Sequence, residues 1–229
     1  MKIDIQKNLA LVKESISLYS ARYGRNCSEI TLLAVSKGQS NEKIRQAILS
    51  GQHRFGENYL QEALPKIIEF SQEALEWHFI GPIQQNKTKK IAENFHWVHG
   101  VCDLKIAVRL NDQRPHTLPP LNICLQVNVS EEKTKSGLVL DEVLFLCNEC
   151  QKLSHLKLRG LMTIPAQKSA ISDQRKEFRK LSNLFCSLKQ KGFELDTLSM
   201  GMSNDLEAAI AEGSTLVRIG RGIFGEREH

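Results

Sequence analysis

Lys37 is the residue of this chain whose type and position most clearly suggest covalent chemistry. It ends the apolar run TLLAVSK at residues 31–37. Removal from water at the end of such a run lowers the pKa of a lysine amine and favours its neutral form. A neutral amine can attack a carbonyl carbon and form a Schiff base. When Lys37 is considered alone, the favoured interpretation is structural: a lysine whose charged amine extends past the strand end into water.

Two segments near the C-terminus have the composition of a phosphate-binding site. In SMGMSNDLEAAIAEG an apolar run ends at Gly201, and Ser203 or Asn204 is expected to cap the helix that follows. A helix N-terminus with a hydroxyl beside it presents donors to an anion. The next run, LVRIG, ends at Gly220, where backbone amides can approach a phosphate closely. Together with Lys37, these segments favour phosphate binding over two ordinary strand-to-helix turns.

Arg218 lies inside the last run, two residues before Gly220, so that both face one side of a strand. A guanidinium within an apolar strand needs an acceptor. It can pair with a carboxylate such as that of Glu57, or it can donate to a ring nitrogen of a ligand. His78 and His99 lie in other apolar runs. Hydrogen-bonded core positions are the first interpretation for both histidines, and acid–base groups are the second.

Two further motifs carry no function in our interpretation. The sequence GRGIFG at residues 220–225 has the spacing GxGxxG, but only four residues follow it, so we expect no βαβ unit and no dinucleotide site. Cys147 and Cys150 form a CxxC inside a stretch that reads as a helix, and no second pair completes a zinc site. We interpret these two cysteines as packing residues.

The elements that must position these residues are eight short β-favouring runs separated by helix-like stretches. Several runs are apolar at consecutive positions, as is typical of parallel strands covered on both faces. The runs are TLLAVSK (31–37), HRFGEN (53–58), WHFIG (77–81), HWVHG (96–100), NICLQVNV (122–129), LRGLMTI (158–164), TLSMG (197–201) and LVRIG (216–220).

The helix-like stretches have recognisable ends. The first twenty residues place an apolar residue every three or four positions, which predicts an N-terminal helix. Ser40 or Asn41 is expected to cap a second helix, and Asp103 and Asp141 to open two more. Pro65 interrupts the segment 59–70 and predicts a kinked or shortened helix there.

Eight strands that alternate with helices over 229 residues predict an α/β fold, a (β/α)8 TIM barrel with an extra N-terminal helix. A doubly wound open sheet is the alternative. No break in composition suggests a second domain, so residues 1–229 are expected to form one. In a barrel the function belongs at the carboxyl ends of the strands, where Lys37, Asn58, Ser203 and Gly220 stand.

Composition excludes several classes of protein. The excess of Lys and Arg over Asp and Glu is 31 − 26 = +5, and aromatic residues are 6%, so we expect no nucleic-acid partner. No apolar stretch approaches a membrane span or a signal peptide, and the six cysteines are scattered. Without a visible export segment, cytoplasmic localisation with reduced thiols is the expectation.

Between residues 31 and 225 the chain resembles a known family, the pyridoxal 5′-phosphate (PLP) homeostasis proteins. These proteins are single (β/α)8 barrels similar to the N-terminal domain of alanine racemase, the fold-type III arrangement for this cofactor. The matching segments are AVSKGQS, RFGENYLQE, WHFIGPIQQNK, LNDQRP, QVNVSEEKTKSG, RGLMTIP, SMGMSNDLEAAIAEGSTLVRIG and IFG.

The resemblance implies a role for six residues. At two positions this chain departs from the family pattern: Arg221 stands where relatives often have Thr, so only its backbone amide is expected to contact phosphate, and SKGQS lacks the Thr and Pro that often follow the lysine. The residues implied to bind PLP are Lys37 (Schiff base, as an internal aldimine), Asn58 (near the ring), Ser203 (phosphate), Arg218 (pyridine nitrogen), Gly220 and Arg221 (backbone phosphate contacts).

The implied function is PLP homeostasis without catalytic turnover, in a monomer that serves PLP-dependent apo-enzymes. An arginine keeps its proton, leaves the pyridine nitrogen unprotonated and makes the ring a weak electron sink. Racemase-like enzymes take a second acid from another domain, and none is visible here. The alternatives are a racemase that uses Tyr59 or His78 as this acid, and a Schiff-base aldolase for a phosphosugar. Whether Lys133 and Lys135 form a second PLP site stays open.

Overall fold

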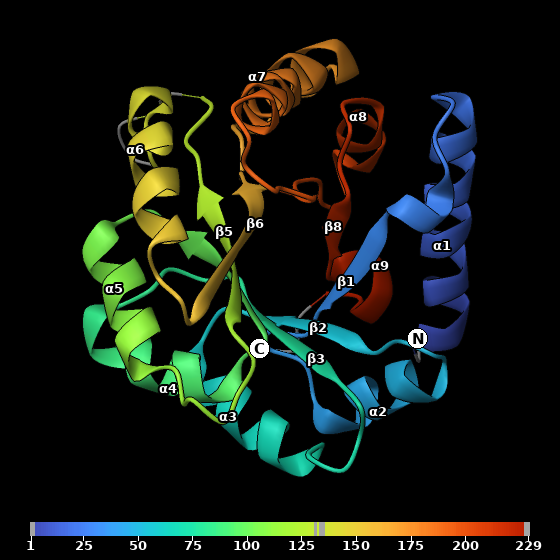
Figure 1. The fold of residues 1–229 in the computed structure, drawn as a ribbon. Helices are drawn as coiled ribbons and strands as arrows, with labels where there is room; N and C mark the ends of the chain where they lie inside the picture. Colours follow the sequence, from blue (N-terminus) through green and yellow to red (C-terminus); the bar gives the residue numbers. More distant parts are fainter. Residues whose placement is uncertain (1–2, 131, 133–135, 227–229) are drawn as a thin grey trace.

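The protein is a closed barrel of parallel strands surrounded by helices (Figure 1). The computed structural model describes residues 3–130, 132 and 136–226. Within them eight strands pair in chain order, and the last pairs with the first, so the (β/α)8 prediction is confirmed and the open sheet is excluded. The strands are β1 (Thr31–Val35), β2 (Arg54–Glu57), β3 (Glu76–Phe79), β4 (Trp97–Val101), β5 (Leu121–Gln126), β6 (Leu156–Met162), β7 (Thr197–Ser199) and β8 (Leu216–Ile219).

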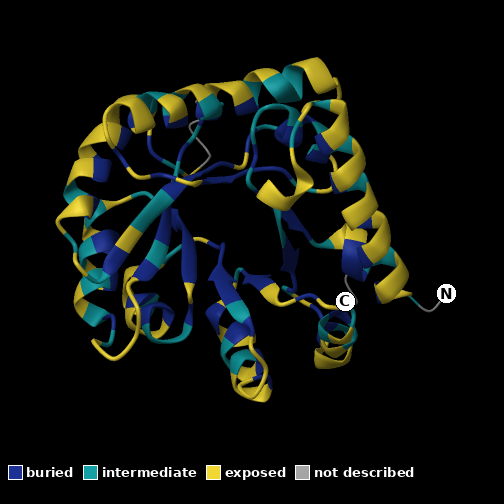
Figure 2. Ribbon diagram, turned by 45° about the vertical axis from the view of Figure 1, so that its right-hand side comes forward, coloured by how far each residue is buried: buried dark blue, intermediate teal, exposed yellow. Residues whose placement is uncertain are grey.

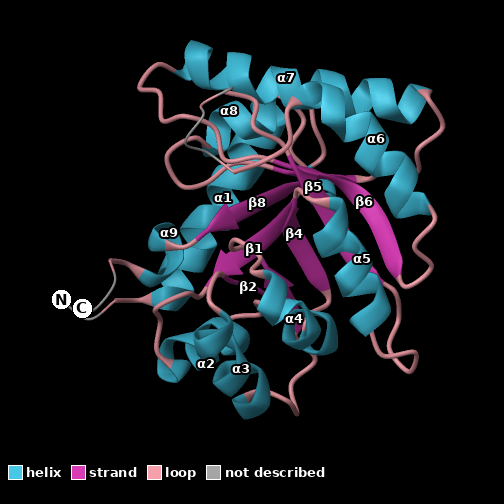
Figure 3. Cartoon of the chain, turned by 90° about the vertical axis from the view of Figure 1, so that its left-hand side faces the viewer, coloured by secondary structure: helices cyan, strands magenta, loops and turns pink. Residues whose placement is uncertain are grey.

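Helices follow the strands and form an outer ring (Figures 1 and 3). Two short 3₁₀ turns, η1 (Cys27–Glu29) and η2 (Gln85–Lys87), complete the connections in the described part of the chain. The helices are α1 (Ile5–Arg22), α2 (Asn41–Leu49), α3 (Leu60–Glu69), α4 (Thr88–Asn94), α5 (Leu104–Gln113), α6 (Leu140–Gln151), α7 (Ile171–Gln190), α8 (Leu206–Ala211) and α9 (Arg221–Phe224).

The predicted N-terminal helix is present and lies outside the barrel, beside α8 and α9 (Figure 1). Asp4 caps α1 by accepting a hydrogen bond from the backbone amide of Lys7 at 2.9 Å. The apolar face of α1 is buried, and the side-chain amide of Asn8 donates to the carbonyl of Ile223 in α9 at 2.9 Å. This helix therefore covers the outer side of the barrel next to the seam between β8 and β1.

The hydrophobic core has two layers, one outside and one inside the ring of strands. Figure 2 shows that the strands are mostly buried and that the helices around them have exposed outer faces. The larger layer lies between the strands and the helices and contains residues such as Ala34, Phe55 and Ile219. Inside the barrel, Leu33, Val35, Ile80 and Leu216 form one small cluster, and Trp97, Cys124 and Met162 form another. Polar side chains fill the remaining interior.

Several local predictions are confirmed, and others are wrong. Asp141 does not open α6, which begins at Leu140 with Val139 at its N-cap. Ser40 and Asp103 cap α2 and α5 as expected. Pro65 does not shorten α3, which runs through it from Leu60 to Glu69. A proline removes one backbone donor, and the packed face of α3 compensates for that loss. Asp205, and neither Ser203 nor Asn204, stands at the N-cap of α8, and its carboxylate accepts from the amide of Met202.

The cysteines are reduced, and none of the described helices has the length and apolarity that a membrane span requires. Cys147 and Cys150 lie on the inner face of α6 and are buried. Burial raises the pKa of each thiol to about 12, so both carry their protons at neutral pH. Their environment is that of packing residues.

Candidate functional site at the barrel mouth

The carboxyl ends of β8, β1 and β2 lie side by side and bring three of the predicted residues to one end of the barrel. Lys37 follows β1 and is half-buried, two positions beyond Val35, which packs inside the barrel. Asn58 follows β2, and Gly220 follows β8. Val35 faces the barrel interior, and Lys37 stands in the turn that directly follows β1. The mouth of the barrel thus carries a lysine, an amide and a glycine turn.

A buried ion pair supports the strand end that leads to Lys37. Lys66 of α3 donates from Nζ to Glu57 Oε1 and to the backbone carbonyl of Ser36, both at 2.8 Å. The hydroxyl of Ser36 donates to the same carboxylate oxygen at 2.7 Å. Burial raises the pKa of Glu57, and Lys66 opposes the rise. The two charges hold the ends of β1 and β2 against α3, outside the barrel interior.

The same helix holds the other side of the lysine. The backbone amide of Gly38 donates to Glu62 Oε2 at 2.8 Å. Glu62 and Lys66 are four residues apart on α3 and therefore share one face of the helix. Lys37 thus stands between two backbone groups, one in Ser36 and one in Gly38, that α3 fixes from outside. We call Glu62 and Lys66 the α3 clamp.

Asn58 presents an acceptor without a partner. Its Oδ1 is buried and has no hydrogen-bond partner among the described residues. Buried polar atoms are seldom left unsatisfied, so an orphaned acceptor indicates a missing donor. The backbone of Asn58 is also packed tightly against Gly81, where an added Cβ would lie 2.2 Å from the Asn58 carbonyl oxygen. Glycine at position 81 is thus required for the close approach of the β2 and β3 ends.

Arg218 is a buried cation in the inner row of β8. It donates from Nη1 to the carbonyl and to the hydroxyl of Ser199 at 2.6 and 2.7 Å, and from Nη2 to the carbonyl of Thr163 at 2.8 Å. Burial lowers its pKa to about 10, so the guanidinium is protonated at neutral pH. No carboxylate of the described residues lies within ion-pair distance of it, and the expected pairing with Glu57 is wrong because Glu57 points out of the barrel toward Lys66.

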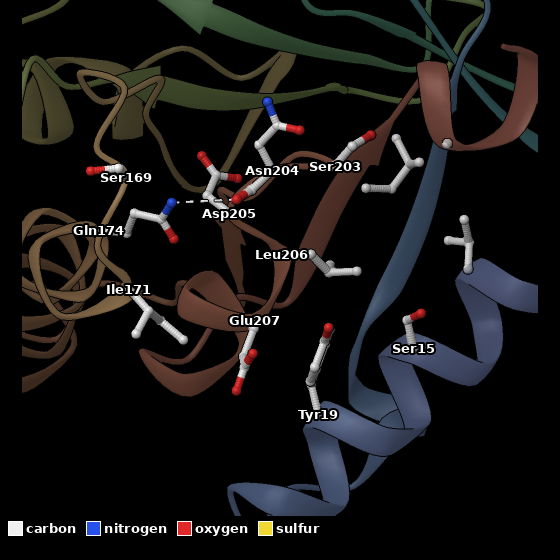
Figure 4. A pocket seen from close by; sticks show the side chains of 13 residues that line it. Ser15, Tyr19, Ser169, Ile171, Gln174, Ser203, Asn204, Asp205, Leu206 and Glu207 are labelled. Atoms are coloured by element: carbon white, nitrogen blue, oxygen red, sulfur yellow. Dashed lines mark hydrogen bonds between the residues drawn. The ribbon is translucent and has the colours of Figure 1, made fainter.

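The two C-terminal segments meet as the sequence predicts. Ser203 lies in the β7–α8 loop and lines a cavity of about 370 Å³ together with Gly222, at the start of α9 (Figure 4). A Cβ at Gly222 would lie 3.5 Å from Ser203 Oγ. Gly220 stands at the N-cap of α9, so the backbone of this turn is held beside the serine. Arg221 is exposed, and its guanidinium lies 3.5 Å from Glu226.

Sequence reasoning missed the residues that hold the others in place. Ser199 and Thr163 accept from Arg218, and the α3 clamp supports Lys37; none of these was singled out. The i,i+4 spacing of Glu62 and Lys66 on the helix after the second strand is a usable signal. His78 and His99 are buried and hydrogen-bonded, which confirms their first interpretation as core residues. Lys133 and Lys135 lie outside the described residues.

Fold and site together define a class: closed (β/α)8 barrels with a half-buried lysine after the first strand and a buried arginine in the last. Residues 20–228 match the family of alanine racemase N-terminal domains. The pyridoxal phosphate homeostasis protein of Escherichia coli K12 is 51% identical in an alignment of 229 residues that covers 99% of this chain and 98% of that protein. The Pseudomonas aeruginosa protein of the same name is 50% identical over 225 residues, 98% of this chain and 96% of that protein. The chain belongs to the pyridoxal phosphate homeostasis proteins.

Solved structures agree with this assignment. PipY of Synechococcus elongatus PCC7942, solved with PLP bound, has a TM-score of 0.84 and 32% identity, and the match covers 97% of this chain and all of that one. An alanine racemase of Clostridium difficile 630 has a TM-score of 0.73 at 16% identity, with 97% of this chain but 58% of the racemase covered. At that identity the racemase shares the fold.

Proposed function

We propose that this chain binds PLP at the mouth of its barrel and acts in PLP homeostasis. Relatives that are 50 and 51% identical over nearly the whole chain carry the name pyridoxal phosphate homeostasis protein. The PipY structure with PLP bound covers 97% of this chain. The observation on this chain that supports the proposal best is the environment of Arg218. Its guanidinium is buried and protonated and has no carboxylate partner among the described residues. Arg218 lies in β8, which pairs with β1, the strand that Lys37 follows.

The donor set fits the chemistry of this cofactor. PLP has three groups that a protein can hold: an aldehyde, which combines with a lysine amine, an aromatic ring nitrogen, and a phosphate. In the proposal Lys37 is the amine, and Arg218 donates to the ring nitrogen and keeps its own proton. Asn58 stands near the ring in the proposal, and its buried Oδ1, which has no partner among the described residues, is available as an acceptor. Ser203 and the backbone amides at Gly220 and Arg221 hold the phosphate.

We further propose that the protein has no catalytic turnover of its own. A racemase would need a second acid at the mouth, and His78 does not fit because both of its ring nitrogens are engaged inside the barrel. Tyr59 is half-exposed at the start of α3. In the proposal, residues 1–229 form one PLP-binding domain that works as a cytoplasmic monomer and supplies PLP-dependent apo-enzymes.

The visible absorbance spectrum of the protein with added PLP tests the proposal. We expect a band that borohydride removes, and we expect Lys37→Ala to lack it. Lys89→Ala is the matched control, because its side chain is 69% exposed on α4 and should leave the band unchanged. No band in the wild type would overturn PLP binding. A band with α-proton exchange of added amino acids above background would overturn the absence of turnover.

A further inference from the structure

A continuous chain of hydrogen bonds runs through the interior of the barrel and ends at Arg218. Arg218 Nη1 lies 2.7 Å from Ser199 Oγ, and Ser199 Oγ lies 2.8 Å from His99 Nδ1. His99 Nε2 lies 2.9 Å from His78 Nδ1, and His78 Nε2 lies 2.8 Å from Glu76 Oε1. The members come from β8, β7, β4 and β3, and all except Glu76 are buried. The chain therefore spans the barrel from its mouth to its amino end.

The arginine end of the chain is compatible with one order of the protons. A guanidinium can only donate, so Ser199 Oγ accepts from Arg218. The single hydroxyl proton of Ser199 can then point at His99 Nδ1. In that order a neutral His99 carries its proton on Nε2 and donates from there to His78.

The carboxylate end selects this order. Burial favours the protonated form of Glu76, but the hydrogen bond from His78 and the charge of Arg54 lower its pKa to about 2, so it is ionised at neutral pH. An ionised carboxylate only accepts, so His78 Nε2 carries a proton and donates. Burial lowers the pKa of both His78 and His99, which keeps the rings neutral. His78 Nδ1 is consequently an acceptor, so His99 donates to it from Nε2. The Nδ1 of the neutral His99 ring then accepts from the hydroxyl of Ser199.

The surroundings hold this arrangement. The indole of Trp97 stacks on His78 with ring centroids 5.4 Å apart and planes within 6°. The guanidinium of Arg159 lies 4.7 Å from the Trp97 ring centroid on the way to the barrel's amino end. There, a cavity of about 380 Å³ is lined by the charged side chains of Glu29, Arg54, Glu76, Arg159 and Asp196. The carboxylate of Glu76 is therefore in reach of solvent, whereas His78, which also lines this cavity, is buried together with His99 and Ser199.

We propose that His78, His99 and Ser199 are positioning residues that connect Arg218 to Glu76 through a proton-ordered hydrogen-bond chain. Each hydrogen bond in this chain is donated in the direction from Arg218 toward Glu76. The negative charge of Glu76 therefore makes the hydroxyl oxygen of Ser199 a stronger acceptor, and this oxygen orients Arg218 at the mouth of the barrel. The inference rests on the proposed function in one respect: Arg218 is the residue that donates to the ring nitrogen of PLP in that proposal.

The first test needs no cofactor. In the ¹⁵N NMR spectrum of the cofactor-free protein at neutral pH, His78 and His99 should both be neutral and protonated on Nε2. Glu76→Gln keeps the size of the side chain but removes its charge, and we expect it to shift the ring nitrogens of His99, which it does not touch. Asp196→Asn is the matched control. The carboxylate of Asp196 lines the same cavity, but it accepts hydrogen bonds from Arg159 and Thr197 instead of from His78. Protonation of either ring on Nδ1, or no change at His99 in Glu76→Gln, would overturn the chain.

The second test reads the effect at the mouth. In PLP-loaded protein, Glu76→Gln should move the absorbance maximum of the bound cofactor and weaken PLP binding at least about twofold. Asp196→Asn should do neither. An unmoved maximum with unchanged affinity in Glu76→Gln would overturn the positioning role. Absence of PLP binding by the wild type would contradict the proposed function instead, and the tautomers of the cofactor-free protein would still decide whether the chain exists.

Discussion

At the scale of the residue, the buried part of this protein contains ionisable side chains that burial would otherwise penalise. Glu57, His78, His99 and Arg218 are each at most 4% exposed. Each has a partner suited to its charge: Lys66 for Glu57, neutral hydrogen-bonded rings for the two histidines, and carbonyl and hydroxyl oxygens for Arg218. Such groups tie stability to pH because their protonation differs between folded and unfolded chains.

The two buried histidines should make the protein less stable as the pH falls below about 6.5. Burial lowers the pKa of His78 and His99 from 6.5 in the folded protein, whereas both keep ordinary values in the unfolded chain. The unfolded state then binds more protons, and the free energy of unfolding decreases by up to about 1.4 kcal/mol per pH unit for each histidine. Urea unfolding at pH 7.5, 6.5 and 5.5 measures this slope.

A single variant separates the buried histidines from other titrating groups. His99→Gln removes one of the two and should flatten the dependence on pH, whatever its effect on stability at pH 7.5. His53→Gln, at an exposed position just before β2, should keep the wild-type slope. Equal slopes in the wild type and in His99→Gln would show that burial of this ring is not the source of the pH dependence.

At the scale of the element, α3 does more than cover the barrel. Its Glu62 binds the amide of Gly38, and its Lys66 binds the carbonyl of Ser36, so one helix face fixes the backbone on both sides of Lys37. A lysine that must meet a carbonyl carbon at a defined angle benefits from such support, because small displacements of a reacting group are costly. The α3 clamp therefore supports the proposed lysine site from outside the barrel.

Loss of one half of the clamp should weaken PLP binding more than it weakens the fold. Glu62→Ala frees the amide of Gly38, and we expect PLP binding to weaken about two- to tenfold, the range of one hydrogen bond. Stability should change by less than about 1 kcal/mol because Glu62 is exposed. Titration with PLP and urea unfolding measure the two effects.

The same helix offers the control. Glu69→Ala removes another carboxylate of α3, one that pairs with Arg45 at 2.8 Å and is 45% exposed. This variant should bind PLP like the wild type. Equal losses of affinity in Glu62→Ala and Glu69→Ala would assign the effect to the helix as a whole and contradict the clamp.

At the scale of the whole molecule, the barrel closes only because certain strands approach without side chains between them. Gly160 of β6 pairs with Thr197 of β7, and a Cβ at position 160 would lie 1.7 Å from the Thr197 carbonyl oxygen. No side chain can be accommodated at that distance, so β6 and β7 would have to separate. We expect Gly160→Ala to lower the urea midpoint strongly, in a transition shared by far-UV and tryptophan signals.

Gly192→Ala is the comparison for this effect. Its backbone has φ +92°, and no atom lies within 4 Å of the added Cβ. The cost should be that of the backbone alone, about 1–2 kcal/mol. Equal decreases of the urea midpoint in Gly160→Ala and Gly192→Ala would contradict this prediction. They would show that β6 and β7 can separate at position 160 without loss of the cooperative barrel.

The order of elements and the location of the mouth could be predicted from sequence. Each of the eight runs overlaps a strand, and Ser40 and Asp103 cap their helices as expected, because apolar patterning and capping act within a few residues of the chain. Lys37, Asn58 and Gly220 could be placed at one end of the barrel because parallel strands of a barrel carry their carboxyl ends together.

The partners of the buried charges could not be predicted. Arg218 was expected to pair with Glu57 or a ligand, yet the two side chains point to opposite faces of the barrel wall, and Ser199 and Thr163 receive the guanidinium. The helix cap at Asp205 was misplaced by one or two residues for a local reason, the turn at Met202.

The amino-acid sequence by itself thus determined that eight strands exist and in which order they follow, because apolar patterning depends on neighbours along the chain; it did not determine the residue at which each strand ends. Only the tertiary structure decided which polar side chains meet inside. His99 and Ser199 are separated by 100 residues and lie within hydrogen-bond distance because barrel closure, strand register and tilt bring β4 and β7 around one axis. The path from Arg218 to Glu76 is a property of that closed geometry.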